Sequence, residues 1–134
     1  AILRKLHYYA VLCPNAISQK AAVAALTGSQ ECVKEMVTEF DRRRKYVLSE
    51  LDRIKNLFYT VPKGAFYVFP DFSSYEKSDE ALTSYLLKEV GVATAPGSGF
   101  GRVGKGHLRI SYSVSYEQVK EGMERIRKCL EHNV

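Results

Sequence analysis

The chain has 134 residues, of which 46% are hydrophobic and 26% are charged. A chain of this length and balance can bury enough surface for one compact core, and its composition excludes a disordered tail. No apolar run approaches the roughly 18 residues that a membrane span needs, so no membrane partner is expected. The net charge of +5 comes from basic residues scattered among 15 acidic ones, so nucleic acid is not a favoured partner either.

The three cysteines give no sign of a stabilising cross-link. Cys13, Cys32 and Cys129 are odd in number and have neither CxxC spacing nor histidines clustered around them. This pattern predicts neither a disulfide framework nor a zinc site. We therefore expect a reducing compartment, the cytoplasm, and no bound metal.

Two helices are predicted in the first part of the chain. Residues 17–26 are rich in alanine and contain no helix breaker. Over residues 30–55, apolar residues recur at spacings of three and four, which predicts the longest helix of the chain. The basic run at 42–45 crosses this helix and is interpreted as a solvated face, with a polyanion site as the alternative. The apolar stripe consists of Val33, Met36, Val37, Phe40, Val47, Leu51 and Ile54.

The middle of the chain predicts a hairpin, a helix and a short strand. Segments 57–61 and 65–72 are rich in aromatic and β-branched residues, and a Pro-Lys-Gly turn separates them, which favours a β-hairpin. Ser78 is placed to cap a helix that Gly91 would end in a left-handed conformation. A short strand at 92–95 follows.

The last part of the chain predicts one strand and one helix. In residues 107–113, Leu108, Ile110 and Tyr112 alternate with polar residues, which is typical of a half-buried strand. Ser115 and Gln118 then match a capping box at the start of a closing helix, whose core stripe is Val119, Met123, Ile126 and Leu130. The element order predicts an α+β fold, in which a small sheet, a hairpin plus two further strands, packs on long helices.

A glycine-rich stretch imitates two nucleotide-binding motifs. Residues 99–104 match the spacing G-x-G-x-x-G, and residues 99–105 overlap a P-loop pattern. The next predicted element is a strand rather than a helix, and Gly106 stands where a P-loop has Ser or Thr. We therefore expect a turn between strands that binds no nucleotide.

Five ordered motifs resemble the class I/II (fold type I) aminotransferases of the aspartate aminotransferase type, which depend on pyridoxal phosphate. These are the stretches at 13–19, 62–70, 91–93, 96–101 and 107–112, and the resemblance runs from about residue 8 to residue 130. It implies that Arg109 binds the α-carboxylate of the substrate, because a guanidinium matches a carboxylate with two parallel N–H donors. It also implies that Phe66 forms a wall of the substrate pocket, with core packing as the alternative role.

The resemblance implies that this chain is part of an enzyme that transfers an amino group between an amino acid and a 2-oxo acid. Residues 1–28 would lead from a large domain that precedes them, and residues 29–134 would form the C-terminal small domain. The lysine that carries the cofactor and the other cofactor-binding residues belong to the large domain, so this chain contains no catalytic residue. Alone it is expected to bind no cofactor and to be inactive, whereas the parent enzyme is expected to be a homodimer. Aspartate, alanine and aromatic amino acids all remain open as substrates.

Two functions of other classes are alternatives. A stand-alone basic α+β module that binds RNA or another polyanion would need exposed rings beside lysines, which Tyr67, Phe69 and Tyr112 could supply. An interaction domain could also have kept the fold and lost the chemistry. Exposure of these three rings distinguishes the first alternative from an ordinary core.

Overall fold

The computed structural model describes residues 2–133, with side chains up to residue 131, and the chain divides into two compact units, Ala1–Glu35 and Met36–Val134. The first unit contains helices α1 (Ile2–Val11) and α2 (Ala16–Thr27), and helix α3 (Glu31–Leu51) begins in it.

The helices of the first unit have no core. Helix α2 confirms the helix predicted at 17–26 and begins at Asn15, whose side chain accepts a 2.8 Å hydrogen bond from the Ser18 amide. Helix α1 was not predicted. None of the described residues of α1 or α2 is buried, and Leu3 and Leu26 are each 82% exposed. Both helices therefore present apolar side chains that nothing within this unit covers.

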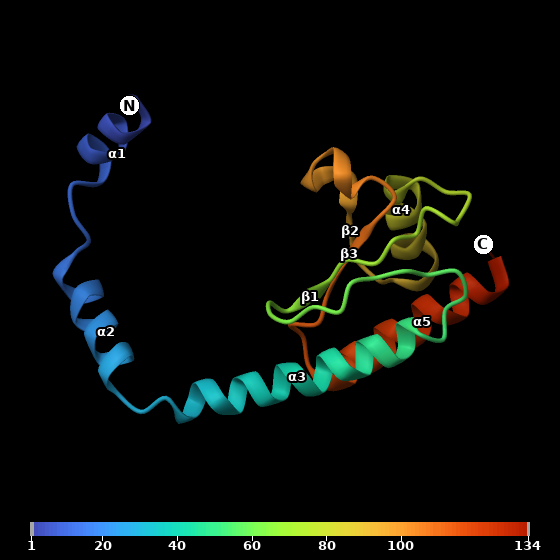
Figure 1. Cartoon of the computed structure of the whole chain (residues 1–134), viewed down its shortest axis with the longest axis horizontal. Coiled ribbons are helices and arrows are strands. Elements are labelled where there is room, and N and C mark those ends of the chain that lie inside the picture. The colour runs from blue at the N-terminus through green and yellow to red at the C-terminus, as the bar shows by residue number, and fades with distance from the viewer. Residues whose placement is uncertain (1, 134) are drawn as a thin grey trace. The chain divides into compact units, whose positions relative to one another are not determined.

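The second unit is built on a three-stranded antiparallel sheet (Figure 1). Strand β3 (Leu108–Ser111) lies between β1 (Tyr67–Val68) and β2 (Ala95–Pro96), with Val68 opposite Ile110 and Ala95 opposite Arg109. Two short 3₁₀ helices, η1 (Gly97–Phe100) and η2 (Arg102–Gly104), connect β2 to β3. The α+β fold is confirmed, and the glycine stretch is a turn between two strands.

The predicted hairpin is mostly wrong. Only one antiparallel bridge joins its two segments, Phe58 with Asp71, and β1 pairs with β3 instead. In segment 57–61, Phe58 is 70% exposed, whereas the Tyr59 hydroxyl shares its one proton between the Leu48 carbonyl of α3 and the Asp52 carboxylate. Burial, followed by that bond to Asp52, raises the pKa of Tyr59 to about 12.

Local capping signals set the ends of α4 (Asp79–Val90) and the start of α5 (Tyr116–Asn133). The Ser78 side chain accepts the Ala81 amide at 3.2 Å, and Gly91 ends α4 in the left-handed region at φ 67°. The Ser115 hydroxyl accepts the Gln118 amide, while the Gln118 side chain accepts the Ser115 amide, each at 3.3 Å. The three predicted caps, at Ser78, Gly91 and Ser115, are confirmed.

The stripe predicted for 30–55 divides into two parts. Its last positions, Val47, Leu51 and Ile54, are buried, although α3 ends at Leu51, before Ile54. Its first positions are exposed, with Met36 at 53% and Val37 at 58%. The periodic pattern was correct, but only the part of the stripe that lies over the sheet is covered. The core is made of Val47, Leu51, Val68, Leu82, Leu86, Leu108, Ile110, Val119, Met123, Ile126 and Leu130, among others.

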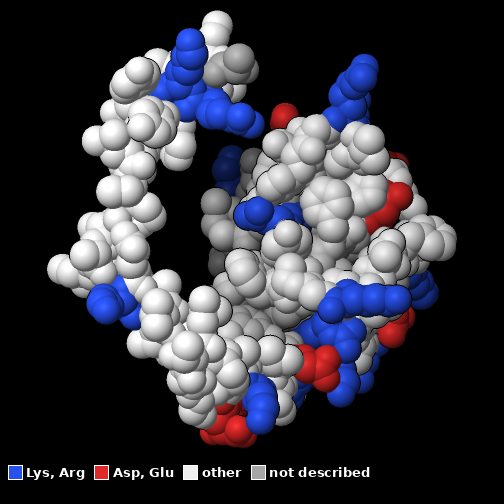
Figure 2. All heavy atoms as spheres, turned by 60° about the vertical axis from the view of Figure 1, so that its left-hand side comes forward, with Lys and Arg blue, Asp and Glu red and all other residues white. Residues whose placement is uncertain are grey.

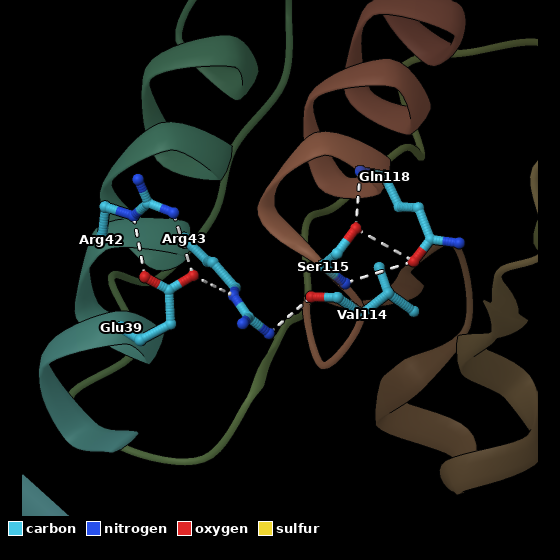
Figure 3. A network of polar contacts seen from close by, with 6 residues as sticks. All are labelled: Glu39, Arg42, Arg43, Val114, Ser115 and Gln118. Atoms are coloured by element: carbon cyan, nitrogen blue, oxygen red, sulfur yellow. Dashed lines mark hydrogen bonds and ion pairs between the residues drawn. The ribbon is translucent and has the colours of Figure 1, made fainter. Parts of the chain in front are cut away.

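Two polar contacts join α3 to α5. Glu50 of α3 is 3% exposed, and its carboxylate accepts hydrogen bonds from Arg53 at 2.8 Å and from Arg127 of α5 at 3.2 Å. Near the start of α5, the Arg43 guanidinium bonds both Glu39 and the Val114 carbonyl (Figure 3). A buried carboxylate needs such partners, because an unpaired buried charge is costly.

Two simple findings complete the fold. Within residues 2–133 no helix combines the length and apolarity that crossing a membrane requires. All three cysteines are free; Cys13 and Cys32 are exposed, and Cys129 is buried.

Replacing Gly91 with alanine should lower the free energy of unfolding by about 1–2 kcal/mol, because a side chain is strained in the left-handed region. Gly99→Ala is the matched control, since a Cβ there would meet nothing within 4 Å and its φ is not in that region. Denaturant unfolding measures both variants, and equal destabilisation of the two would contradict the capping role of Gly91.

Backbone amides of α1 and α2 should exchange with deuterium faster than those of α5, because helices without buried residues open more readily. Dilute samples analysed by exchange and mass spectrometry provide the comparison, and repeating it over a range of concentrations controls for self-association. Protection in α2 equal to that in α5 at the lowest concentration would refute this expectation.

Candidate functional site

Arg109 lies at the centre of the sheet, on the middle strand β3. Its neighbours Leu108 and Ile110 are 0% and 6% exposed, whereas Arg109 is half-buried. Because side chains alternate across a strand, Arg109 projects from the face opposite the one that Leu108 and Ile110 bury. The core thus anchors the strand while the guanidinium is presented on the other face.

Two aromatic rings hold the guanidinium of Arg109. Its Cζ atom lies 4.6 Å from the centroid of the Phe100 ring and 5.6 Å from that of the Tyr67 ring. Contacts of this kind are worth about 0.5–1 kcal/mol each at exposed positions. Tyr67 belongs to β1, which pairs with β3, and Phe100 belongs to η1. One ring is therefore placed by the sheet and the other by a loop.

Arg109 differs from the other partly buried arginines in having no acidic partner. Arg43, Arg44 and Arg127 all form ion pairs, but none of the carboxylates in the described part of the chain pairs with Arg109. Rings cover a guanidinium on its faces, whereas its N–H donors point outward in its plane. That edge is the part that binds a carboxylate through two parallel hydrogen bonds. The arrangement suits a carboxylate supplied from outside these residues.

Phe66 is connected to Arg109 through the ring of Tyr67, which contacts both residues. Its ring is 5.7 Å from that of Tyr67, at 87°, and 6.3 Å from that of Phe40. The side chain is 48% exposed, so Phe66 is not a core residue. It lines a groove of about 660 Å³ together with Phe40 and Tyr112, and Arg109 is not among the lining residues of that groove. The structure therefore connects Phe66 to Arg109 through Tyr67 and not through a shared pocket.

Further rings extend the contact surface beyond Phe100. Phe69 meets Phe100 edge-on at 6.0 Å and stacks on His107 at 5.0 Å. Of the three rings suggested for an RNA-binding face, Tyr67 contacts Arg109, Phe69 contacts these rings, and Tyr112 is 1% exposed. Tyr112 is a core residue, because its place in the alternation of 107–113 is the buried one. Of the three rings only Tyr67 is exposed, at 40%, so together they do not form the continuous open platform that stacking with RNA would use.

The basic run at 42–45 is only partly neutralised on its own helix, because its four cations share two carboxylates. Arg42 and Arg43 pair with Glu39, while Arg44 and Lys45 pair with Asp41. The hydrogen bonds from Arg42 and then Arg43 lower the pKa of Glu39. Arg43 is less solvated than expected, with 17% of its side chain exposed. Acidic side chains lie beside basic ones on the face shown in Figure 2. The acidic partners of Arg42, Arg43, Arg44 and Lys45 weaken the case for a polyanion site at this run.

Two glycines of the glycine-rich loop, Gly97 and Gly104, are required by packing. A Cβ on Gly97 would lie 2.0 Å from the Gly104 carbonyl oxygen, and a Cβ on Gly104 would lie 2.1 Å from the Gly97 oxygen. The two backbones therefore touch where the loop closes, a contact that only glycine permits. Strand β3 follows the loop, and no helix N-terminus is placed there to meet a phosphate.

A cofactor or metal has no ready-made place among these residues. Every buried side-chain nitrogen or oxygen in the described part of the chain has a hydrogen-bond partner. The same residues include no group of three His, Cys, Asp or Glu side chains that could hold a metal. The groups packed against the Arg109 guanidinium are rings and include no lysine. The residues present do not fit pyridoxal phosphate by themselves.

Two residues of this region were missed by the sequence analysis. Phe100 was assigned no role, although it is an apolar ring in a glycine-rich loop, where exposure is common. Asp79, which follows the Ser78 cap, was also assigned no role, yet it is 4% exposed and its carboxylate accepts the Ser98 amide at 2.7 Å. The sequence shows an acidic residue at the start of α4, but it does not show that Asp79 is buried, and burial is what distinguishes it from a solvated side chain.

Comparison with known proteins assigns a family. A model of the aminotransferase class I and II family matches residues 3–126. An aspartate aminotransferase of Pyrococcus horikoshii is 40% identical over 96% of this chain, and a probable aspartate/prephenate aminotransferase of Aquifex aeolicus is 39% identical over 97%. The crystal structure of an aromatic aminotransferase from Pyrococcus horikoshii matches with a TM-score of 0.88 and 40% identity over 95% of this chain.

The chain corresponds to only part of these proteins. It spans 34% of the length of each of the two relatives and 34% of the Pyrococcus horikoshii crystal structure. The family match nevertheless extends over nearly the whole of the chain. This chain therefore belongs to the aminotransferase class I and II family.

Proposed function

We propose that this chain is the C-terminal, substrate-clamping part of an aminotransferase subunit, and that Arg109 binds the α-carboxylate of the substrate. The observation that carries the proposal is a guanidinium held between Phe100 and Tyr67 with no acidic partner among the described residues. Amino acids and 2-oxo acids both carry a carboxylate next to the reacting carbon. One arginine can therefore bind both substrates in the same orientation.

The role of Arg109 is positional. Two parallel hydrogen bonds to the carboxylate fix the α-carbon, and a fixed α-carbon lowers the barrier for losing its proton to a nearby base. Pyridoxal phosphate, when bound to the full-length enzyme, supplies an electron sink for this chemistry. The residues that hold the cofactor would come from the part of the subunit outside this chain, so the chain alone would be inactive. Phe66 would line the same substrate cleft from beyond Tyr67.

The two parts of the chain would have different tasks in the parent subunit. Residues 1–28 would lead from the large domain, and residues 29–134 would form the small domain that carries Arg109. The exposed apolar residues of α1 and α2 support a packing surface outside this chain. We expect the parent enzyme to be a homodimer, as the family implies.

In the full-length subunit, Arg109→Leu should reduce kcat/KM for every amino acid by an amount equivalent to about 2–5 kcal/mol, the usual loss when one partner of a buried ion pair is removed. Arg109→Lys should restore part of it, since an ammonium keeps the charge but loses the paired donors. Steady-state kinetics with several amino acids, alongside melting curves, measures both.

Arg102→Leu is the matched control, because Arg102 is an exposed arginine in the loop next to β3. It should leave kcat/KM unchanged. A steep fall in melting temperature for Arg109→Leu, with kcat/KM of the folded fraction unchanged, would show that Arg109 is structural.

The 134-residue chain should not acquire pyridoxal phosphate at one lysine. After incubation with the cofactor and reduction with borohydride, mass spectrometry should find only scattered labelling, because any exposed lysine amine reacts slowly. A full-length relative that labels at a single lysine is the positive control. Stoichiometric labelling at one lysine of this chain would refute the proposal that the cofactor site lies outside it.

A further inference from the structure

The ring of Phe100 needs a support other than the core. It makes the closer of the two ring contacts with Arg109, at 4.6 Å, but 54% of Phe100 is exposed. Burial therefore does little to hold this ring in place. Its position depends on the backbone of η1, which carries it, and on whatever fixes η1 to the rest of the fold.

Asp79 holds η1 from outside the loop. Its Oδ2 accepts a hydrogen bond from the Ser98 backbone amide at 2.7 Å, which joins the start of α4 to the second residue of η1. The neighbouring Glu80 accepts the Ser98 hydroxyl at 3.3 Å, a longer contact made by an exposed side chain. Asp79 is 4% exposed, so its contact is protected from water.

Asp79 stays charged because of backbone amides. The hydrogen bond from the Ser98 amide is the main influence that lowers the pKa of Asp79, and burial opposes it. Ser78 caps α4, so Asp79 also lies at the helix end where negative charge is favoured. The carboxylate thus joins the start of α4 to the start of the glycine-rich loop.

We propose that Asp79 is a positioning residue for Arg109: by holding the Ser98 amide, it keeps the Phe100 ring against the guanidinium. Asp79 accepts the Ser98 amide, and Ser98 lies in η1 together with Phe100. The Phe100 ring in turn contacts the Arg109 guanidinium. Asp79 touches no substrate in this scheme. Its importance for catalysis rests on the carboxylate-binding role proposed for Arg109, but the contacts themselves do not.

The test follows the Arg109 side chain by NMR in the 134-residue chain. A proton over the face of an aromatic ring resonates upfield, so the Arg109 Hε signal should be displaced from those of exposed arginines. Asp79→Asn keeps the shape of the side chain and removes its charge, and Phe100→Leu removes the ring. Both variants should move the Arg109 signal towards that of exposed arginines. Glu80→Gln, the matched control, should leave it in place.

Three results would overturn the proposal. The first is an Arg109 signal that stays displaced in Asp79→Asn while the signals of the α4 and α5 core persist. The second is an unchanged Arg109 signal in Phe100→Leu, because the route runs through that ring. The third needs no variant: a Ser98 amide in the unaltered chain that exchanges as fast as exposed loop amides would show that Asp79 does not hold it.

The NMR experiment on Asp79 and the kinetic experiment on Arg109 can succeed or fail independently of each other. Because no substrate is present in the NMR experiment, it tests only whether Asp79 positions Arg109. If Asp79→Asn releases Arg109 but Arg109→Leu leaves kcat/KM unchanged in the full-length subunit, the positioning stands and the carboxylate role fails. The reverse pair of results would leave the carboxylate role and remove Asp79 from it.

Discussion

The burial of Leu108 and Ile110 is the constraint on which the site depends. Fully burying a side chain of this size contributes about 1.5–3 kcal/mol, and both face the core from the middle strand of the sheet. Arg109 stands between them, so its direction follows from theirs. A slip of one residue would expose the two apolar side chains and bury the guanidinium, and both changes are unfavourable. The core thereby selects the direction of a charged group that is not part of it.

The arginines of this unit show two ways of placing a cation. Arg43 and Arg127 are held by carboxylates and join α3 to α5, so their charge is already satisfied within the fold. Arg109 contacts two aromatic rings, which accept no hydrogen bond from it and so leave its N–H donors available. The ion-paired arginines therefore stabilise the fold, whereas an arginine held only by rings can still bind an anion.

What the sequence could predict depended on how local the signal was. The caps at Ser78, Gly91 and Ser115 were predicted correctly, because each motif lies within a few residues and depends little on the rest of the fold. The hairpin was wrong because the same β-forming composition fits several partners, and β1 found its partner in a distant strand. Periodicity in α3 identified an apolar face but not what covers it.

The site shows the same limit. The role of Arg109 was predicted from the family resemblance and stays a prediction, whereas the contacts of Phe100 and Asp79 are visible only in the structure. The touching backbones of Gly97 and Gly104 have one more consequence. They close residues 98–103 into a ring whose base is fixed next to β2 and β3, so the number and kind of residues within it can vary without changing the strand register. The loop that carries Phe100 could therefore change in length or composition while the strand that carries Arg109 stays in register.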